Sequence, residues 1–125
     1  MKQTQPPTNG TFQEFYKNGQ LKMVSQYKLG KQNGTCKSYF QDGKLWAIGK
    51  MKNGKFSGPW KWNRKTGGLL QAGRFVEGLQ DGLWKRYHPN GKLYDEGKWK
   101  MGKRIGHWKT YFPTGKLRRT KTFAS

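Results

Sequence analysis

The stretch Gly43–Thr66 reads GKLWAIGKMKNGKFSGPWKWNRKT, and near-copies of it recur every 24 residues along the chain. Three series of glycines keep this spacing without insertion or deletion, and together they account for 13 of the 18 glycines. A fixed period of this kind is typical of stacked repeats, in which each unit buries its apolar side against its neighbours. The three series are Gly19, Gly43, Gly67, Gly91 and Gly115; Gly30, Gly54, Gly78 and Gly102; and Gly34, Gly58, Gly82 and Gly106.

Each unit contains two strand-like runs and two turns. In the quoted unit the longer run is Leu45–Lys52 and the shorter one is Trp60–Arg64. Asn53 and Gly54 separate them, and an Asn-Gly pair is a strong turn signal because both residues tolerate positive φ. No stretch shows a helical period of 3.6 residues. The sequence therefore predicts an all-β protein, a long twisted antiparallel meander sheet of about ten strands.

Apolar and basic residues alternate along the longer run, so one face of the sheet is expected to be the core and the other to be wet. The core face carries a small residue once per unit, and this predicts that an aromatic ring from a neighbouring unit lies over it. The tryptophans Trp60, Trp84 and Trp108 recur in register and are expected to form the core. Cys36 stands at the same position, where we expect it to fill a small buried gap. The small residues are Ser25, Gly49, Gly73 and Gly97.

The chain of 125 residues is long enough for one domain. We divide it into a polar leader (1–11), one repeat domain (12–123) with five turn repeats, and a tail (124–125). Apolar residues make up 32 % and the net charge is +20, values typical of disorder, but the aromatic residues (15 %) keep to the period, so we expect a folded chain. The compartment stays open: periplasm if a signal sequence has been removed, otherwise cytoplasm.

Catalytic chemistry has no signature in this sequence. His88 replaces an aromatic residue of other units, and neither it nor His107 has ligands at metal spacing. Asp95 and Glu96 are adjacent, so in a strand they point to opposite faces and cannot act as a pair. We expect no enzyme activity, no metal and no cofactor. Four of the six acids fall between residues 77 and 96, where they are expected to balance nearby cations or, alternatively, to contact a partner. These acids are Glu77, Asp81, Asp95 and Glu96, and the cations are Arg74, Lys98 and Lys100.

Positive charge is the strongest functional signal. A net charge of about 2–8 is enough to keep a small domain soluble, so +20 implies an acidic partner: a protein, an anionic membrane or a nucleic acid. Each row taken alone also has a simpler interpretation, since lysines on a sheet prevent edge-to-edge aggregation. One row contains Lys37, Lys61, Lys85 and Lys109, and another contains Lys50, Arg74 and Lys98.

The unit also resembles a known family, the variant MORN repeat (membrane occupation and recognition nexus), over roughly residues 12–123. Local departures are Cys36, Gly68 and Leu79, and Asn63 with Arg64 predicts a looser third turn. The resemblance implies β-hairpin repeats. Bacterial members are commonly described as antitoxins or immunity proteins, and related proteins as membrane scaffolds. The motif is fullest at Asn90, Gly91, Lys92, Leu93, Gly97, Trp99, Gly102, Lys103, Gly106, Trp108 and Tyr111.

From the charge and the resemblance together we expect a non-enzymatic immunity protein or antitoxin that occludes the active site of an acidic bacterial toxin or secretion-system effector. Binding to anionic membranes is the first alternative and binding to nucleic acid the second. Trp46, Tyr94 and Arg118 follow the turn leucine on the face expected to be wet, where they would act as anchors. The full set of expected partner-binding residues is Trp46, Tyr94, Lys103, Arg104, Lys109, Lys116, Arg118 and Arg119.

Overall fold

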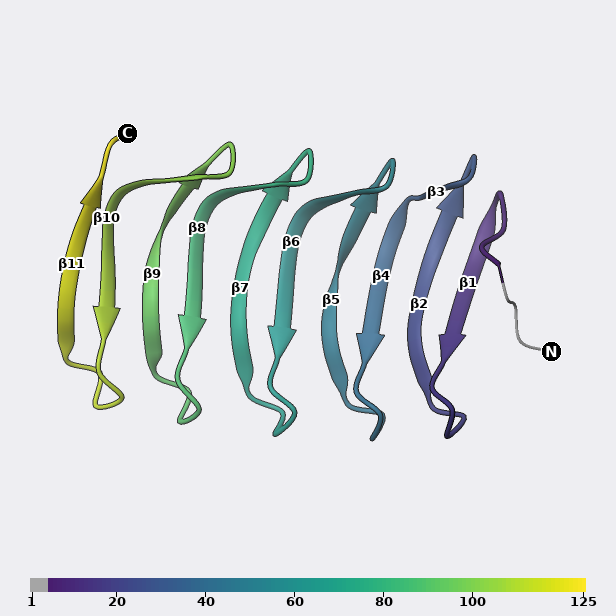
Figure 1. The fold of residues 1–125 in the computed structure, drawn as a ribbon, viewed down its shortest axis with the longest axis horizontal. Coiled ribbons are helices and arrows are strands. Elements are labelled where there is room, and N and C mark those ends of the chain that lie inside the picture. The colour runs from purple at the N-terminus through teal and green to yellow at the C-terminus, as the bar shows by residue number, and fades with distance from the viewer. Residues whose placement is uncertain (1–4) are drawn as a thin grey trace.

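The structure, a computed structural model, describes residues 5–125, so residues 1–4 of the expected polar leader lie outside the described part. The described residues form eleven strands in one antiparallel sheet (Figure 1). Their bounds are β1 Gly10–Phe15, β2 Leu21–Lys28, β3 Lys31–Gln32, β4 Gly34–Tyr39, β5 Leu45–Lys52, β6 Lys55–Asn63, β7 Leu69–Val76, β8 Leu79–Tyr87, β9 Leu93–Lys100, β10 Lys103–Tyr111 and β11 Leu117–Phe123. The predicted all-β meander is confirmed.

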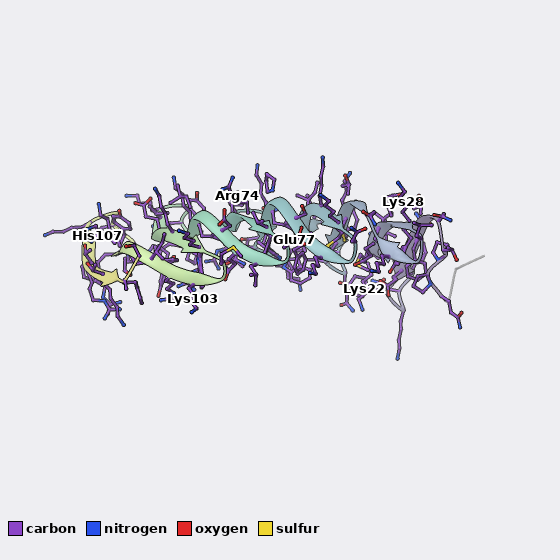
Figure 2. All side chains as sticks on the ribbon, turned by 90° about the horizontal axis from the view of Figure 1, so that it is seen from above. Lys22, Lys28, Arg74, Glu77, Lys103 and His107 are labelled. Carbon is purple, nitrogen blue, oxygen red and sulfur yellow. The ribbon has the colours of Figure 1, made fainter. Side chains whose placement is uncertain are left out.

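The sheet is a single open layer. Strands that follow one another in the chain are neighbours in the sheet, from β1 at one end to β11 at the other, with the short β3 pairing to β2 beside this path. Seen from above in Figure 2, the strands form one thin band with side chains projecting along its whole length; His107 lies near one end and Lys28 near the other. Both faces of the band are therefore available to a partner.

The lower turns of Figure 1 share one hydrogen-bond pattern. At the second of them, the Gly43 N–H donates to the Phe40 carbonyl (2.9 Å) and the Phe40 N–H donates to the Lys44 carbonyl (2.8 Å). The third turn makes the same two bonds through Arg64. The Arg64 guanidinium also donates to the Tyr87 carbonyl of the next turn (2.8 Å). At the equivalent positions Tyr16 and His88 hydrogen-bond to the next turn in the same way. The third turn thus keeps the hydrogen bonds of the other turns, and the expected looser turn is not seen in them.

Tryptophan rings and glycines hold the strands together. The Trp60 ring lies over Gly49, where a Cβ atom would come within 2.0 Å of ring carbon Cδ2, and the Trp60 indole N–H donates to the Lys50 carbonyl (2.9 Å). In the same way the Trp84 ring lies over Gly73 and the Trp108 ring over Gly97. Their indole N–H groups donate to the carbonyls of Arg74 and Lys98. The predicted ring over the small residue is present, but it comes from the next strand of the same 24-residue unit and not from a neighbouring unit.

Cys36 replaces the tryptophan in one unit, and there the small residue is also different. Ser25 stands where later units have glycine, and its side chain is fully buried. The Cys36 side chain is buried as expected, and burial raises the pKa of its thiol above the ordinary value. Cys36 is smaller than the tryptophan of other units, and Ser25 is larger than the glycine, so the two changes together keep the core close-packed.

The strands β6, β8 and β10 each leave the upper turn sideways and then bend into the sheet (Figure 1). A glycine in the left-handed region lies in each bend: φ is +69° at Gly58, +75° at Gly82 and +68° at Gly106. The pairing of β5 with β6 shifts between Ile48 and Lys50 at this level. Because a glycine adopts this φ without steric cost, the bend lets the tryptophan that follows reach back over the preceding strand.

Candidate partner-binding surfaces

One face of the sheet carries a cross-strand row in which every second residue from Lys37 to Lys109 is a lysine, and we call it the lysine face. The cross-strand partners of this row alternate between a lysine and another residue, so its lysines lie two strands apart, roughly 10 Å from one another. The second predicted row lies on the same face, two residues farther along strands β5, β7 and β9 than the members of the first row. It consists of Lys50, Arg74 and Lys98. In order across the sheet the first row reads Val24, Lys37, Ile48, Lys61, Ala72, Lys85, Glu96, Lys109 and Thr120.

Two shallow grooves lie between these cations, and they are the same feature repeated 24 residues apart. The first groove, of about 470 Å³, has Leu83 and Gly73 among its apolar lining and Lys61, Arg74 and Lys85 among its cations. The second groove, of about 480 Å³, has Gly97, Lys98 and Lys109 at the corresponding positions of the next unit, but Glu96 lies where the first groove has an alanine. The lysine face thus presents a regular pattern of cations and apolar strips, suited to an extended anionic surface.

Acidic side chains neutralise few of the cations. Three ion pairs form in residues 5–125, and the expected charge balance is only partly correct, because Arg74 pairs with Asp81 (2.8 Å) while Lys98 and Lys100 pair with none of the acids. The two adjacent acids do point to opposite faces. Glu96 on the lysine face accepts a hydrogen bond from the Tyr111 hydroxyl (2.6 Å), which raises the pKa of that tyrosine.

The opposite face, which we call the tryptophan face, changes character along the array. In its middle, the ring of Trp62 packs against Trp60 (5.7 Å between centroids) and against Trp84 (5.8 Å). Phe75 packs against Phe56 and Trp84 beside them (4.9 and 5.1 Å). These rings cover one another and form the aromatic core of the sheet.

One unit farther on, charged residues occupy the equivalent positions. Arg86 stands where the preceding unit has Trp62, and it donates two hydrogen bonds from Nε and one from Nη2 to the Asp95 carboxylate (2.5–3.2 Å). Asp95 is buried, whereas half of the Arg86 side chain is exposed (51 %). These bonds raise the pKa of the Arg86 guanidinium further above its ordinary range and fix its orientation.

Arg104 lies beside this pair, on top of three aromatic rings. Its guanidinium carbon is 4.9 Å from the centroid of Trp108 and 5.6 Å from those of Trp99 and Phe123. No acceptor among residues 5–125 binds its N–H groups. A small cavity of about 140 Å³ opens here, and we call it the arginine cleft. Its lining is Arg86, Tyr94, Asp95, Arg104, Trp108, Thr110, Arg118, Arg119, Lys121 and Phe123.

The structure divides the expected partner-binding residues between several places. It brings four of them together in the arginine cleft: Tyr94, Arg104, Arg118 and Arg119. Tyr94 and Arg118 were expected on the wet face, and this was wrong, because the strand pairing shifts beside each of them and they line the cleft on the tryptophan face. Trp46, by contrast, is 43 % exposed and packs against Phe40 of its own turn (6.2 Å between centroids). The other three lie apart: Lys103 at the start of β10, Lys109 in the row on the lysine face, and Lys116 in the last turn.

Sequence reasoning missed Arg86 and Lys121 as members of a site, and it gave Asp95 only as an alternative partner contact. A usable signal was present, because each of them departs from the residue type of the preceding unit at the same position of the repeat. Arg86 follows Trp62, and Lys121 follows Gly97. In a repeat protein such singular positions are not needed for the repeating fold, so they are free to serve a specific contact.

In residues 5–125 no three histidine, cysteine, aspartate or glutamate side chains gather in a way that could hold a metal ion. Within the same residues no helix is long and apolar enough to cross a membrane.

Comparison with known proteins identifies the family. Residues 8–29, 32–53, 80–101 and 104–124 match the family described as MORN repeat variant, and these stretches cover more than two thirds of the chain. The protein therefore belongs to this family of repeat proteins. The unmatched stretch between residues 54 and 79 forms β6 and β7, which continue the same hairpins. No curated protein matches the chain. MORN repeats suggest that this is a binding protein.

Proposed function

We propose that this chain is a non-enzymatic immunity protein or antitoxin, which neutralises an acidic bacterial toxin or secretion-system effector by covering its active site. The excess of unpaired cations carries the proposal. The chain has 26 lysines and arginines against six acids, and three ion pairs form in the described part. A field of this sign accelerates the encounter with an acidic protein.

The arginine cleft favours a protein partner. It lies near the C-terminal end of the array and gathers three arginines that make no ion pair in the described part of the chain, and arginine is among the residue types that dominate binding energy in protein interfaces. A single, asymmetric feature suits one specific contact. The lysine face, in contrast, is regular along its length and supports the alternative function, attachment to an anionic membrane at about 1 kcal/mol for each basic residue near the surface.

The test is to capture the product of the neighbouring gene with this protein and, in parallel, to float the protein with anionic liposomes at physiological salt. We expect a protein complex whose affinity falls as the salt concentration rises, and loss of the captured protein's toxicity in the complex. Flotation with the liposomes, without recovery of a protein partner, would favour the membrane function over the one proposed.

Paired charge reversals locate the interface. Changing Arg118 and Arg119 to glutamate should weaken the complex at least about tenfold, mainly through slower association if these residues lie at the rim of the interface and through faster dissociation if they are buried in it. The matched control changes Lys28 and Lys31 to glutamate at the other end of the array, with the same change in net charge. The control should have a smaller effect. Equal effects of the two pairs would show that net charge alone determines binding.

A further inference from the structure

The arginine cleft holds more positive charge than the acid within it can neutralise. Five cations line it: Arg86, Arg104, Arg118, Arg119 and Lys121. Asp95 is the one carboxylate in this lining, and its hydrogen bonds go to Arg86. The other four cations have no carboxylate within ion-pairing distance in the described part of the chain. An anion that enters the cleft therefore meets a net attraction.

Arg104 is arranged as a preformed anion-binding group. Arg104 is exposed, and the rings of Trp99, Trp108 and Phe123 contact its guanidinium from below, which restricts where the guanidinium can lie before a partner arrives. A guanidinium presents a rigid fork of N–H donors that matches the two oxygens of a carboxylate. The aromatic rings also exclude water from one side of the fork, which strengthens such a pair.

The size of the cleft limits the group that it can hold. A volume of about 140 Å³ has room for the carboxyl end of a side chain but not for a large ligand. Tyr94 forms part of the wall, and its ring centroid is 5.1 Å from the Arg86 guanidinium carbon. The cleft therefore fits a small anionic group, which a protein partner can supply as the end of an acidic side chain.

We infer that the arginine cleft is the anchor point for the acidic partner: an aspartate or glutamate side chain of the bound protein inserts there and pairs with Arg104 and Arg119. The inference rests on the proposed function, since it takes the partner to be a protein. It assigns the lysine face a different part, the long-range attraction that brings the partner near. The cleft then supplies the short-range contacts that determine how slowly the complex dissociates.

The experiment uses the full chain and a short fluorescein-labelled peptide of alternating glutamate and serine, followed by anisotropy at physiological salt. Changing Arg104 and Arg119 to glutamine should raise the dissociation constant at least about tenfold. The matched control changes Lys61 and Lys85 on the lysine face to glutamine, which removes the same charge and should cost less than about threefold. A peptide with glutamine in place of glutamate should not bind.

A second measurement locates the peptide and checks the fold. In the NMR spectrum of the tryptophan indole N–H groups, the Trp108 signal should shift as the peptide is added while the Trp60 signal stays in place. An unchanged Trp60 signal in the glutamine variants shows that they are folded. Arg104→Lys keeps the charge but lacks the fork, so it should weaken binding by an intermediate factor; this variant carries the test if the double variant does not fold.

Three results would overturn the inference: equal weakening by the cleft pair and the lysine pair, a Trp108 signal that does not respond, or binding of a phosphoserine peptide without binding of the glutamate peptide. The last result would make the cleft a phosphate site. Failure of the proposed function is seen separately, in the capture experiment. If a protein partner is captured and the cleft variants bind it as well as the lysine variants do, the function stands and the anchor point is wrong.

Discussion

Substituting Gly73 by alanine tests the packing on which the array depends. An added Cβ atom would lie 2.0 Å from Cδ2 and 2.2 Å from Cε2 of the Trp84 ring, whereas carbon atoms in contact are about 3.5–4.0 Å apart. The ring must therefore move by roughly 1.5 Å, since the backbone on which it lies is held by strand pairing on both sides. That movement breaks the hydrogen bond from the Trp84 indole to the Arg74 carbonyl (3.0 Å).

The cost can be estimated from these two effects. Overpacking costs about 1–3 kcal/mol, and an unsatisfied buried donor about 1–3 kcal/mol more, so Gly73→Ala should lower the free energy of unfolding by about 2–6 kcal/mol. Trp84→Ala should cost about 3–5 kcal/mol through the cavity that it leaves. In the double variant the new methyl group has no ring to meet, so its cost should not exceed that of Trp84→Ala alone.

Guanidinium unfolding followed by far-UV circular dichroism measures all three variants. Gly68→Ala is the control, because a Cβ atom there meets nothing within 4 Å and its φ is not in the left-handed region. It should be neutral or stabilise by about 0.4–1 kcal/mol through the unfolded chain. The reasoning is refuted if Gly73→Ala costs no more than this control, or if the two single effects add to within about 0.5 kcal/mol in the double variant.

Three further predictions follow from the same geometry. Cys36→Trp should destabilise the chain, and adding Ser25→Gly should recover most of the loss in the same unfolding assay; no recovery would mean that the two positions are not coupled. The raised pKa of the Cys36 thiol lowers its thiolate fraction at any pH below that pKa, so alkylation at pH 8 should be slow in the folded protein and fast in guanidinium; equal rates would contradict its burial. Lys121 occupies in β11 the position at which β5, β7 and β9 have a glycine, and it pairs with Trp108. If strand β1 of a second copy docked onto β11, its Phe12 ring, which is equivalent to the tryptophans, would meet the long Lys121 side chain. Lys121→Gly should therefore promote end-to-end association, seen by analytical ultracentrifugation at high salt. Unchanged sedimentation would show that Lys121 does not block this association.

The sequence by itself determined the fold class, the period, the position of the turns and the two faces of the sheet. These properties depend on residues that are neighbours in the chain, such as the Asn53-Gly54 pair at an upper turn. They also recur in each unit, so the turns and strands predicted for one unit are supported by the same pattern in the others. Repetition also identified the core, since Trp60, Trp84 and Cys36 are all buried as expected. For the candidate site, the sequence predicted that the C-terminal arginines matter, and four of the expected residues do line one cleft.

Only the tertiary structure decided which residues meet. The bend at Gly58 and the shift in pairing beside it determine that the Trp60 ring lies over Gly49 in the same unit, and a period alone cannot reveal that direction. The arginine cleft likewise joins Arg86 of β8 to Phe123 of β11, which are brought together by sheet register and not by proximity in the chain. The relative position of these two residues depends on the strand pairing at each step from β8 to β11. A bulge or a turn of different length at any of these steps would move the two residues apart.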